Sequence, residues 1–164
     1  MEILAIISSI LLFGFIVAGV CRFGLLHSYS AYSTKWGSFL GMPVWSLVTF
    51  FAAFLLMPVL IELGVGSAFQ FLGFLTPVYL MGVSLTPGWQ GGGEVFRYHV
   101  VLAGLCAVCG MLWTFLTVGA FSYVVPVVVI LLGLVTGTWR KDYIFWLEMV
   151  AFLSVYSAAL VLLL

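Results

Sequence analysis

The chain has 164 residues, of which 65% are hydrophobic and 6% are charged, and its five basic and five acidic side chains cancel. About a quarter of the residues of a soluble domain are charged, so this composition excludes an ordinary water-soluble fold. A neutral chain also lacks the basic face that nucleic acid requires, and we expect no nucleic-acid partner.

Long apolar runs predict helices that cross a bilayer. About 20 apolar residues span the ~30 Å of hydrocarbon, and the runs here are continuous rather than alternating, which favours helices over a membrane barrel. The opening residues carry Glu2 and no basic group, so we expect no secretory signal there. The predicted fold is all-α: a polytopic membrane protein with a six-transmembrane-helix bundle, in one domain over residues 1–164. The expected helices are 3–20, 44–63, 67–86, 98–118, 121–138 and 143–164.

The first 42 residues contain two features that bear on how the chain packs. Gly14, Ala18 and Cys21 share one face of the first helix, and such small residues are typical of close helix packing. The connection that follows, residues 21–42, is the longest polar stretch of the chain. Its segment Ser28–Ser33 carries two tyrosines, which we expect to lie at headgroup level. The alternative is that this segment lines an entrance or binds a headgroup.

Three prolines, Pro58, Pro77 and Pro126, are expected to interrupt the second, third and fifth helices. A proline removes a backbone hydrogen bond, and broken helices near the midplane are typical of transporters, although proline also serves packing. The fourth helix carries a face of small and polar residues that should contact other helices. These residues are His99, Ala103, Cys106, Ala107, Gly110, Thr114 and Thr117.

The basic residues predict the orientation, because all five fall in alternate connections. They are Arg22, Lys35, Arg97, Arg140 and Lys141. The positive-inside rule places the first, third and fifth connections in the cytoplasm and both termini outside, in the inner or plasma membrane if the source is bacterial. An aromatic belt is expected at the same boundary. Its members would be Trp36, Trp45, Trp89, Trp139 and Trp146.

Glu148 is the one ionisable group well inside a predicted span. A carboxylate at the bilayer centre costs about 3 kcal/mol on insertion scales, so it is expected to be paired, protonated or functional. We expect it to face the bundle interior, within reach of the fourth helix or the first connection. The candidate partners are Arg22, His27, Arg97 and His99. The alternative is a shallow carboxylate that reaches the headgroups.

His27, His99, Cys106 and Glu148 are expected in the same leaflet, which would permit proton handling. Their spacing matches no metal site, so we expect no metal and no cofactor. The Cys106–Cys109 pair resembles quinone-coupled thiol oxidoreductases of the vitamin K epoxide reductase type in its spacing alone, because the second cysteine pair of those enzymes is absent. The chain also lacks the Gly-x-Ser-Gly nucleophile of rhomboid-like proteases.

The leading functional hypothesis is non-enzymatic: a transporter-like, channel-like, small-ligand-binding or lipid-binding membrane subunit. Its ligand- or proton-handling candidates are Glu148, His99, His27, Cys106 and Arg97. One alternative is an intramembrane enzyme acting on a lipid or a thiol, and another is a structural or accessory subunit. The expected partners are the lipid bilayer and either a second copy of the chain or a membrane partner subunit.

Overall fold

The computed structural model describes residues 1–86 and 92–163, except for the side chains of residues 120 and 121, and these residues are mostly helical. Its elements are α1 (Glu2–Phe23), the 3-10 helix η1 (Tyr29–Thr34), β1 (Ser38–Phe39), β2 (Met42–Pro43), α2 (Val44–Leu63), α3 (Gln70–Ser84), α4 (Gly93–Val118), the 3-10 helix η3 (Gly119–Tyr123), α5 (Val124–Val135) and α6 (Trp139–Leu163). The all-α prediction is confirmed, with a single two-stranded hairpin added among the described residues.

Four of the described helices, α1, α2, α4 and α6, are long and apolar enough to cross a membrane. The other two apolar helices are shorter, since α3 has 15 residues and α5 has 12. At 1.5 Å per residue they extend about 22 Å and 18 Å, less than the ~30 Å of hydrocarbon. The fold therefore supports membrane insertion through four helices, and the predicted count of six spans is not confirmed.

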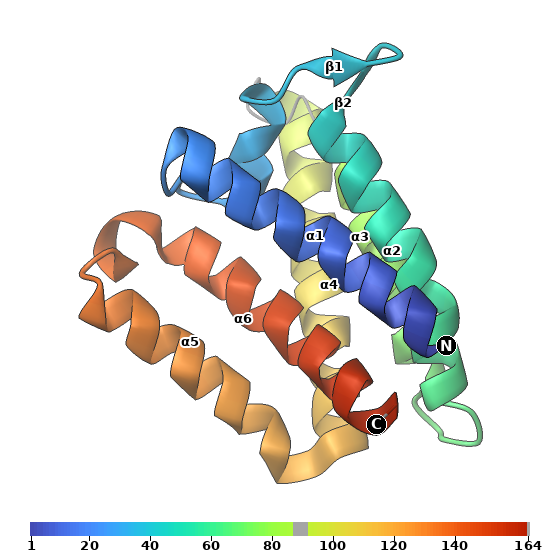
Figure 1. Ribbon diagram of the computed structural model, residues 1–164. Coiled ribbons are helices and arrows are strands. Elements are labelled where there is room, and N and C mark those ends of the chain that lie inside the picture. Colours follow the sequence, from blue (N-terminus) through green and yellow to red (C-terminus); the bar gives the residue numbers. More distant parts are fainter. Residues whose placement is uncertain (87–91, 164) are drawn as a thin grey trace.

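Five helices form the bundle, and α5 lies outside it. Helices α1, α2, α3 and α4 contact one another in chain order, α4 contacts α6, and α6 returns to α1 (Figure 1). Helix α5 packs along α6 and buries only Val129 and Gly133. Both termini lie at the same end of the bundle as the turn between α2 and α3, and the hairpin lies at the opposite end.

The prolines act differently from the prediction. Pro58 and Pro77 lie inside α2 and α3, which continue through them as single helices. Pro126 is the third residue of α5, a position where the N–H has no helical partner in any case. The expected fifth helix over 121–138 is thus replaced by the 3-10 turn η3 followed by a shorter α-helix, and Pro126 does not interrupt it.

The predicted contact face of α1 is wrong, whereas that of α4 is confirmed. Gly14, Ala18 and Cys21 are exposed, and α1 turns another face inward. That face consists of Ala5, Ser8, Leu12, Ile16 and Gly19. On α4 the buried residues include His99, Cys106, Gly110 and Thr114, as expected from their small size and helical spacing.

The proposed aromatic belt also needs correction. Trp45 is fully buried at 0% exposure and belongs to the core rather than to an interface. Trp36, Trp139 and Trp146 are partly buried, and Trp89 lies outside the described residues. The predicted connection beginning at Pro87 is likewise described only from residue 92, and α4 already begins at Gly93. The side of the membrane on which each connection lies stays a prediction.

Candidate functional site

The polar segment between α1 and α2 folds into the protein. Tyr29 and Tyr32 of η1 are only 1% and 0% exposed. Each phenol has a partner inside: Tyr29 lies 2.7 Å from the Thr49 hydroxyl, and Tyr32 donates to the Gly24 carbonyl at 2.8 Å. Burial without such partners would cost several kcal/mol, so these hydrogen bonds make the inward position possible. The two tyrosines therefore pack inside the protein and do not face headgroups, while their depth in the membrane stays a prediction.

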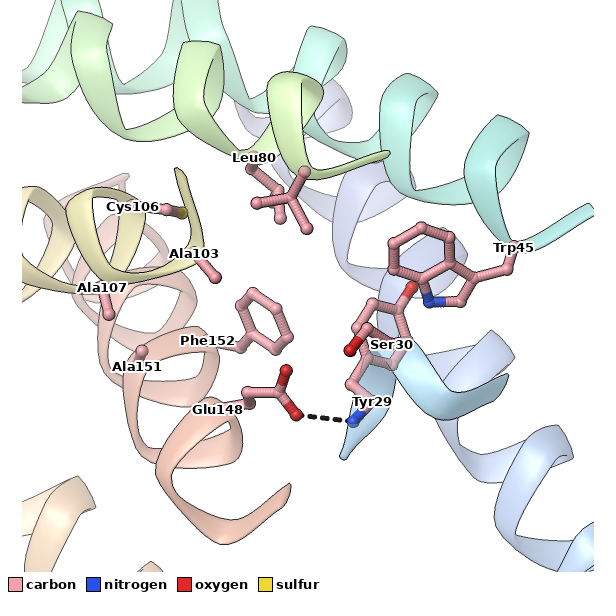
Figure 2. Close-up of a pocket in the computed structure, with 11 residues that line it drawn as sticks. Tyr29, Ser30, Trp45, Leu80, Ala103, Cys106, Ala107, Glu148, Ala151 and Phe152 are labelled. Carbon is pink, nitrogen blue, oxygen red and sulfur yellow. Dashed lines mark hydrogen bonds between the residues drawn. The ribbon is translucent and has the colours of Figure 1, made fainter. Parts of the chain in front are cut away.

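Two hydrogen bonds fasten this segment to α6. Asp142 has non-helical dihedral angles that break α6, and the Phe145 N–H beyond the break donates to the His27 carbonyl at 2.9 Å. In the other direction, the Tyr29 N–H donates to Oε2 of Glu148 at 2.5 Å (Figure 2). The prediction that Glu148 faces inward and is held by the first connection is confirmed, although its partner is a backbone amide and not one of the proposed side chains.

Tyr29 is held between α2 and α6. The Thr49 hydroxyl donates to the Trp45 carbonyl at 2.7 Å, so the Tyr29 phenol is the donor toward Thr49. Burial raises the pKa of the Tyr29 phenol far above its ordinary value, against the smaller opposing effect of the Thr49 hydrogen bond. The phenol is therefore neutral. Its ring lies 5.6 Å from that of Trp45 and 5.5 Å from that of Phe152, so three aromatic side chains meet here.

A cavity of about 440 Å³, which we name the outer cavity, lies between α4 and α6 and is lined also by residues at the start of η1 and just before it. Its polar lining consists of His27, Ser28, Ser30, His99 and Glu148. Its apolar lining consists of Phe96, Val100, Ala103, Gly104, Ala107, Ile144 and Leu147. The outer cavity thus combines a few polar groups with two apolar helix faces.

A smaller space of about 40 Å³, which we name the inner chamber, is lined by the residues drawn in Figure 2. The two share Ser30, Ala103, Ala107 and Glu148 in their linings. The remaining lining of the inner chamber is Tyr29, Trp45, Leu80, Val83, Cys106, Ala151 and Phe152. Aromatic rings and one carboxylate therefore enclose a space large enough for about three water-sized groups.

The second carboxylate oxygen of Glu148 is the group that defines the chemistry of this site. Oε2 is occupied by the Tyr29 amide, whereas Oε1 has no hydrogen-bond partner within residues 1–86 and 92–163. Figure 2 shows this oxygen turned toward the inner chamber, on the side of Phe152. A bound molecule can therefore donate a hydrogen bond to it.

His99 lies near the junction of α3 and α4. Its Nδ1 is 2.8 Å from the Thr86 hydroxyl, which itself donates to the Val83 carbonyl at 2.7 Å. Because that hydroxyl hydrogen is already used, Nδ1 of His99 carries the proton. The imidazole lies 6.4 Å from the ring of Trp45. Arg97, also a candidate, is exposed and does not line either space.

Cys106 and Cys109 are free thiols in the structure. The Cys106 thiol donates to the Thr76 carbonyl at 3.4 Å and lines the inner chamber. Within the described part of the chain, no group of three or more His, Cys, Asp or Glu residues is arranged to hold a metal.

The structure thus brings together Glu148, His27 and His99 at the outer cavity and adds Cys106 at the inner chamber. Sequence reasoning missed Trp45 and Phe152. Phe152 follows Glu148 by four residues, which places both on one face of α6, so helical spacing was a usable signal. No family model, curated protein or solved structure matches the chain.

Proposed function

We propose that the protein binds a small amphipathic, lipid-like molecule in the outer cavity, with its polar end toward Glu148 and its apolar chain between α4 and α6. The observation that supports this most is the cavity itself. Its volume of about 440 Å³ is within the ~300–1,000 Å³ of small-molecule sites. Such sites are mostly apolar with a few placed polar groups, and this cavity has the same composition.

The rim of the outer cavity supports entry from the membrane. Val100 and Leu147, on opposite walls, are 50% and 51% exposed, and Ile144 is 40% exposed. An apolar surface of this kind suits hydrocarbon better than water. The lining of α4 extends over the twelve residues from Phe96 to Ala107, about 16 Å along the helix axis. A single acyl-type chain can lie along that length.

The proposed function includes a membrane arrangement that fixes the depth of the outer cavity. All six apolar helices cross the bilayer, with α3 and the η3–α5 unit as its short spans. The first, third and fifth connections are cytoplasmic and both termini are outside. Lys35 lies in the first connection, and the other four basic residues lie in the helix ends beside the first, third and fifth connections. The polar end of the outer cavity, near His27, then lies toward the cytoplasmic leaflet.

Photo-crosslinking tests the binding site. The full chain in zwitterionic nanodiscs is irradiated with a 12-carbon alcohol that carries a diazirine in its chain, and the modified peptides are identified by mass spectrometry. We expect labelling at Gly104–Ala107 and Ile144–Leu147, competed by the untagged alcohol. Gly104→Leu should reduce it, because nothing lies within 4 Å of a Cβ there and the added side chain projects into the cavity without a clash.

Gly14→Leu is the matched control, since Gly14 is an exposed helical glycine that also has open space around its Cβ. Labelling that spreads over the exposed faces of α1 and α5, is not competed and is equal in both variants would refute the proposed function.

A second candidate, an intramembrane enzyme acting on a lipid, is favoured by one observation. Two imidazoles and a carboxylate, those of His27, His99 and Glu148, line one cavity, and such groups perform general acid–base chemistry. The test is incubation of the reconstituted protein with extracted membrane lipids, followed by a comparison of lipid masses with those from a Glu148→Gln sample. New lipid masses produced only by the wild-type chain would favour this candidate over simple binding.

A further inference from the structure

We infer that the polar head of the bound amphiphile is a primary amine in its ammonium form, held in the inner chamber between the Glu148 carboxylate and the aromatic side chains of Tyr29, Trp45 and Phe152. This inference rests on the proposed function and names the ligand class. Four independent features of the site support it: charge, hydrogen-bond capacity, aromatic content and size.

The charges around the site favour a cation. None of the five Lys and Arg residues lines the outer cavity or the inner chamber, and Glu148 is the one acidic residue in both linings. A phosphate or carboxylate head would find no positive counter-charge there and would face a carboxylate. Desolvating an unpaired anion is costly, whereas an ammonium placed at Glu148 is paired.

Two acceptors in the site, Oε1 of Glu148 and the Ser30 hydroxyl, suit an ammonium, whose N–H groups donate and which accepts no hydrogen bond. Oε1 of Glu148 is open to the inner chamber while Oε2 is fixed by the Tyr29 amide, so the carboxylate is already oriented. The Ser30 hydroxyl lines both spaces and supplies a second acceptor; it lies 3.2 Å from the Ser28 hydroxyl. An ordered carboxylate requires little rearrangement on binding.

Aromatic rings complete the cation site. Tyr29, Trp45 and Phe152 line the same chamber as Glu148, and the negative face of an aromatic ring attracts a nearby cation. The attraction is larger in a site without water, and Trp45 and Tyr29 are 0% and 1% exposed. A carboxylate next to aromatic rings recognises an ammonium better than it recognises a neutral alcohol, which has no charge to interact with either.

The volumes of the two spaces indicate which part of the ligand each one holds. The inner chamber, about 40 Å³, accommodates a head comparable to a few waters, and the outer cavity of about 440 Å³ accommodates a hydrocarbon chain. The shared lining at Ser30, Ala103 and Ala107 is where the chain would pass from one space to the other. A compact ammonium therefore fits better than a bulky zwitterionic head.

Three probes of equal chain length test this assignment: dodecylamine, dodecanol and dodecanoate. Each is titrated into the full chain in zwitterionic nanodiscs at equal membrane concentration, and bound ligand is counted by native mass spectrometry. We expect dodecylamine to bind at least tenfold more tightly than dodecanol, with dodecanoate weakest.

Glu148→Gln is the decisive variant, because its amide oxygen can still accept from the Tyr29 N–H while the negative charge is removed. We expect it to weaken dodecylamine at least tenfold and to leave dodecanol within about twofold. Glu62→Gln, an exposed carboxylate on α2 that does not line either space, should change nothing. Trp45→Phe provides a second variant, expected to weaken dodecylamine severalfold and dodecanol hardly at all, because Trp is the strongest cation–π partner.

The possible failures are distinguishable. If dodecanol or dodecanoate binds as tightly as dodecylamine, or if Glu148→Gln weakens all three equally, the amine assignment is overturned while the binding function stands. If Gly104→Leu leaves the binding of all three probes unchanged, the proposed function itself fails. If Glu148→Gln does not fold, Trp45→Phe decides, and equal losses for amine and alcohol in that variant overturn the assignment.

Discussion

Gly110 and Gly104 lie on the same helix, yet an added methyl group should have opposite effects at the two positions. A Cβ at Gly110 would lie 2.8 Å from Cγ2 of Val155 and 3.2 Å from Cγ2 of Thr76. Favourable carbon contacts are at about 3.5–4.0 Å, so something must move. Neither neighbour moves easily, because Val155 is buried and β-branched and the Thr76 hydroxyl is fixed on the Leu72 carbonyl at 2.8 Å.

The expected difference in unfolding free energy follows from comparing alanine at Gly110 with alanine at Gly104. Replacing glycine by alanine in a helix gains about 1 kcal/mol of helix propensity at either position. Overpacking costs about 1–3 kcal/mol and applies only to Gly110, since a Cβ at Gly104 has nothing within 4 Å. Gly110→Ala should therefore be about 1–3 kcal/mol less stable than Gly104→Ala, and Gly110→Leu should be worse still.

Reversible unfolding in mixed micelles with increasing denaturing detergent, followed by circular dichroism, measures this difference on the full chain. Gly104→Ala should be as stable as the wild type or slightly more stable, and Gly110→Ala should unfold at lower detergent. Equal unfolding midpoints for the two variants would refute the packing of α4 against α3 and α6 at Gly110.

Three further predictions concern the buried segment, the thiols and the topology. Tyr29→Phe should destabilise the protein by about 1 kcal/mol in the same unfolding assay, because it removes the hydrogen bond to the Thr49 hydroxyl. Maleimide should label one thiol per folded chain in detergent, that of the exposed Cys21, and three after denaturation. In a cysteine-free background, cysteine at position 40, where Leu40 is 88% exposed in the hairpin turn, should react from the cytoplasmic side, and cysteine at position 65 should react from outside.

A specific result would contradict each of these three predictions. Tyr123→Phe serves as the control for Tyr29→Phe, since Tyr123 is 59% exposed, and equal effects of the two would argue against the buried position of η1. Rapid labelling of all three thiols in the folded chain would contradict the burial of Cys106 and Cys109. A reversed pattern of reactive sides would invert the proposed orientation.

The fold class was predictable from sequence because composition alone decides it. So was the inward position of Glu148, since a carboxylate within an apolar helix needs a polar partner. The inward fold of η1 was not predictable, because the partners of Tyr29 and Tyr32 are Thr49 and the Gly24 carbonyl, and their pairing depends on how α1 and α2 meet. A serine- and tyrosine-rich segment looks the same at an interface as in a hydrogen-bonded interior.

Two other errors have local causes. The hairpin between η1 and α2 turns at Leu40 and Gly41, which both have positive φ, at 52° and 77°. Two-residue turns of this type usually carry Asn-Gly or Asp-Gly, so Leu-Gly gives a weak signal. Small residues at helical spacing permit close packing but do not require it, as the exposed Gly14 and Ala18 of α1 show. The close contact is instead at Gly19, where ring atoms of Tyr32 lie 3.0 Å from the position of an added Cβ.

The most direct test of the central claim, an amphiphile bound between α4 and α6, is to locate its chain with a heavy atom. Crystals of the full chain grown with 12-bromododecylamine give an anomalous bromine signal that marks the chain end independently of the protein density. We expect a bromine peak in the outer cavity, close to Gly104 and Leu147, that disappears in Gly104→Leu. Bromine found only on the exposed faces of α1 and α5, with the outer cavity holding none, would contradict it.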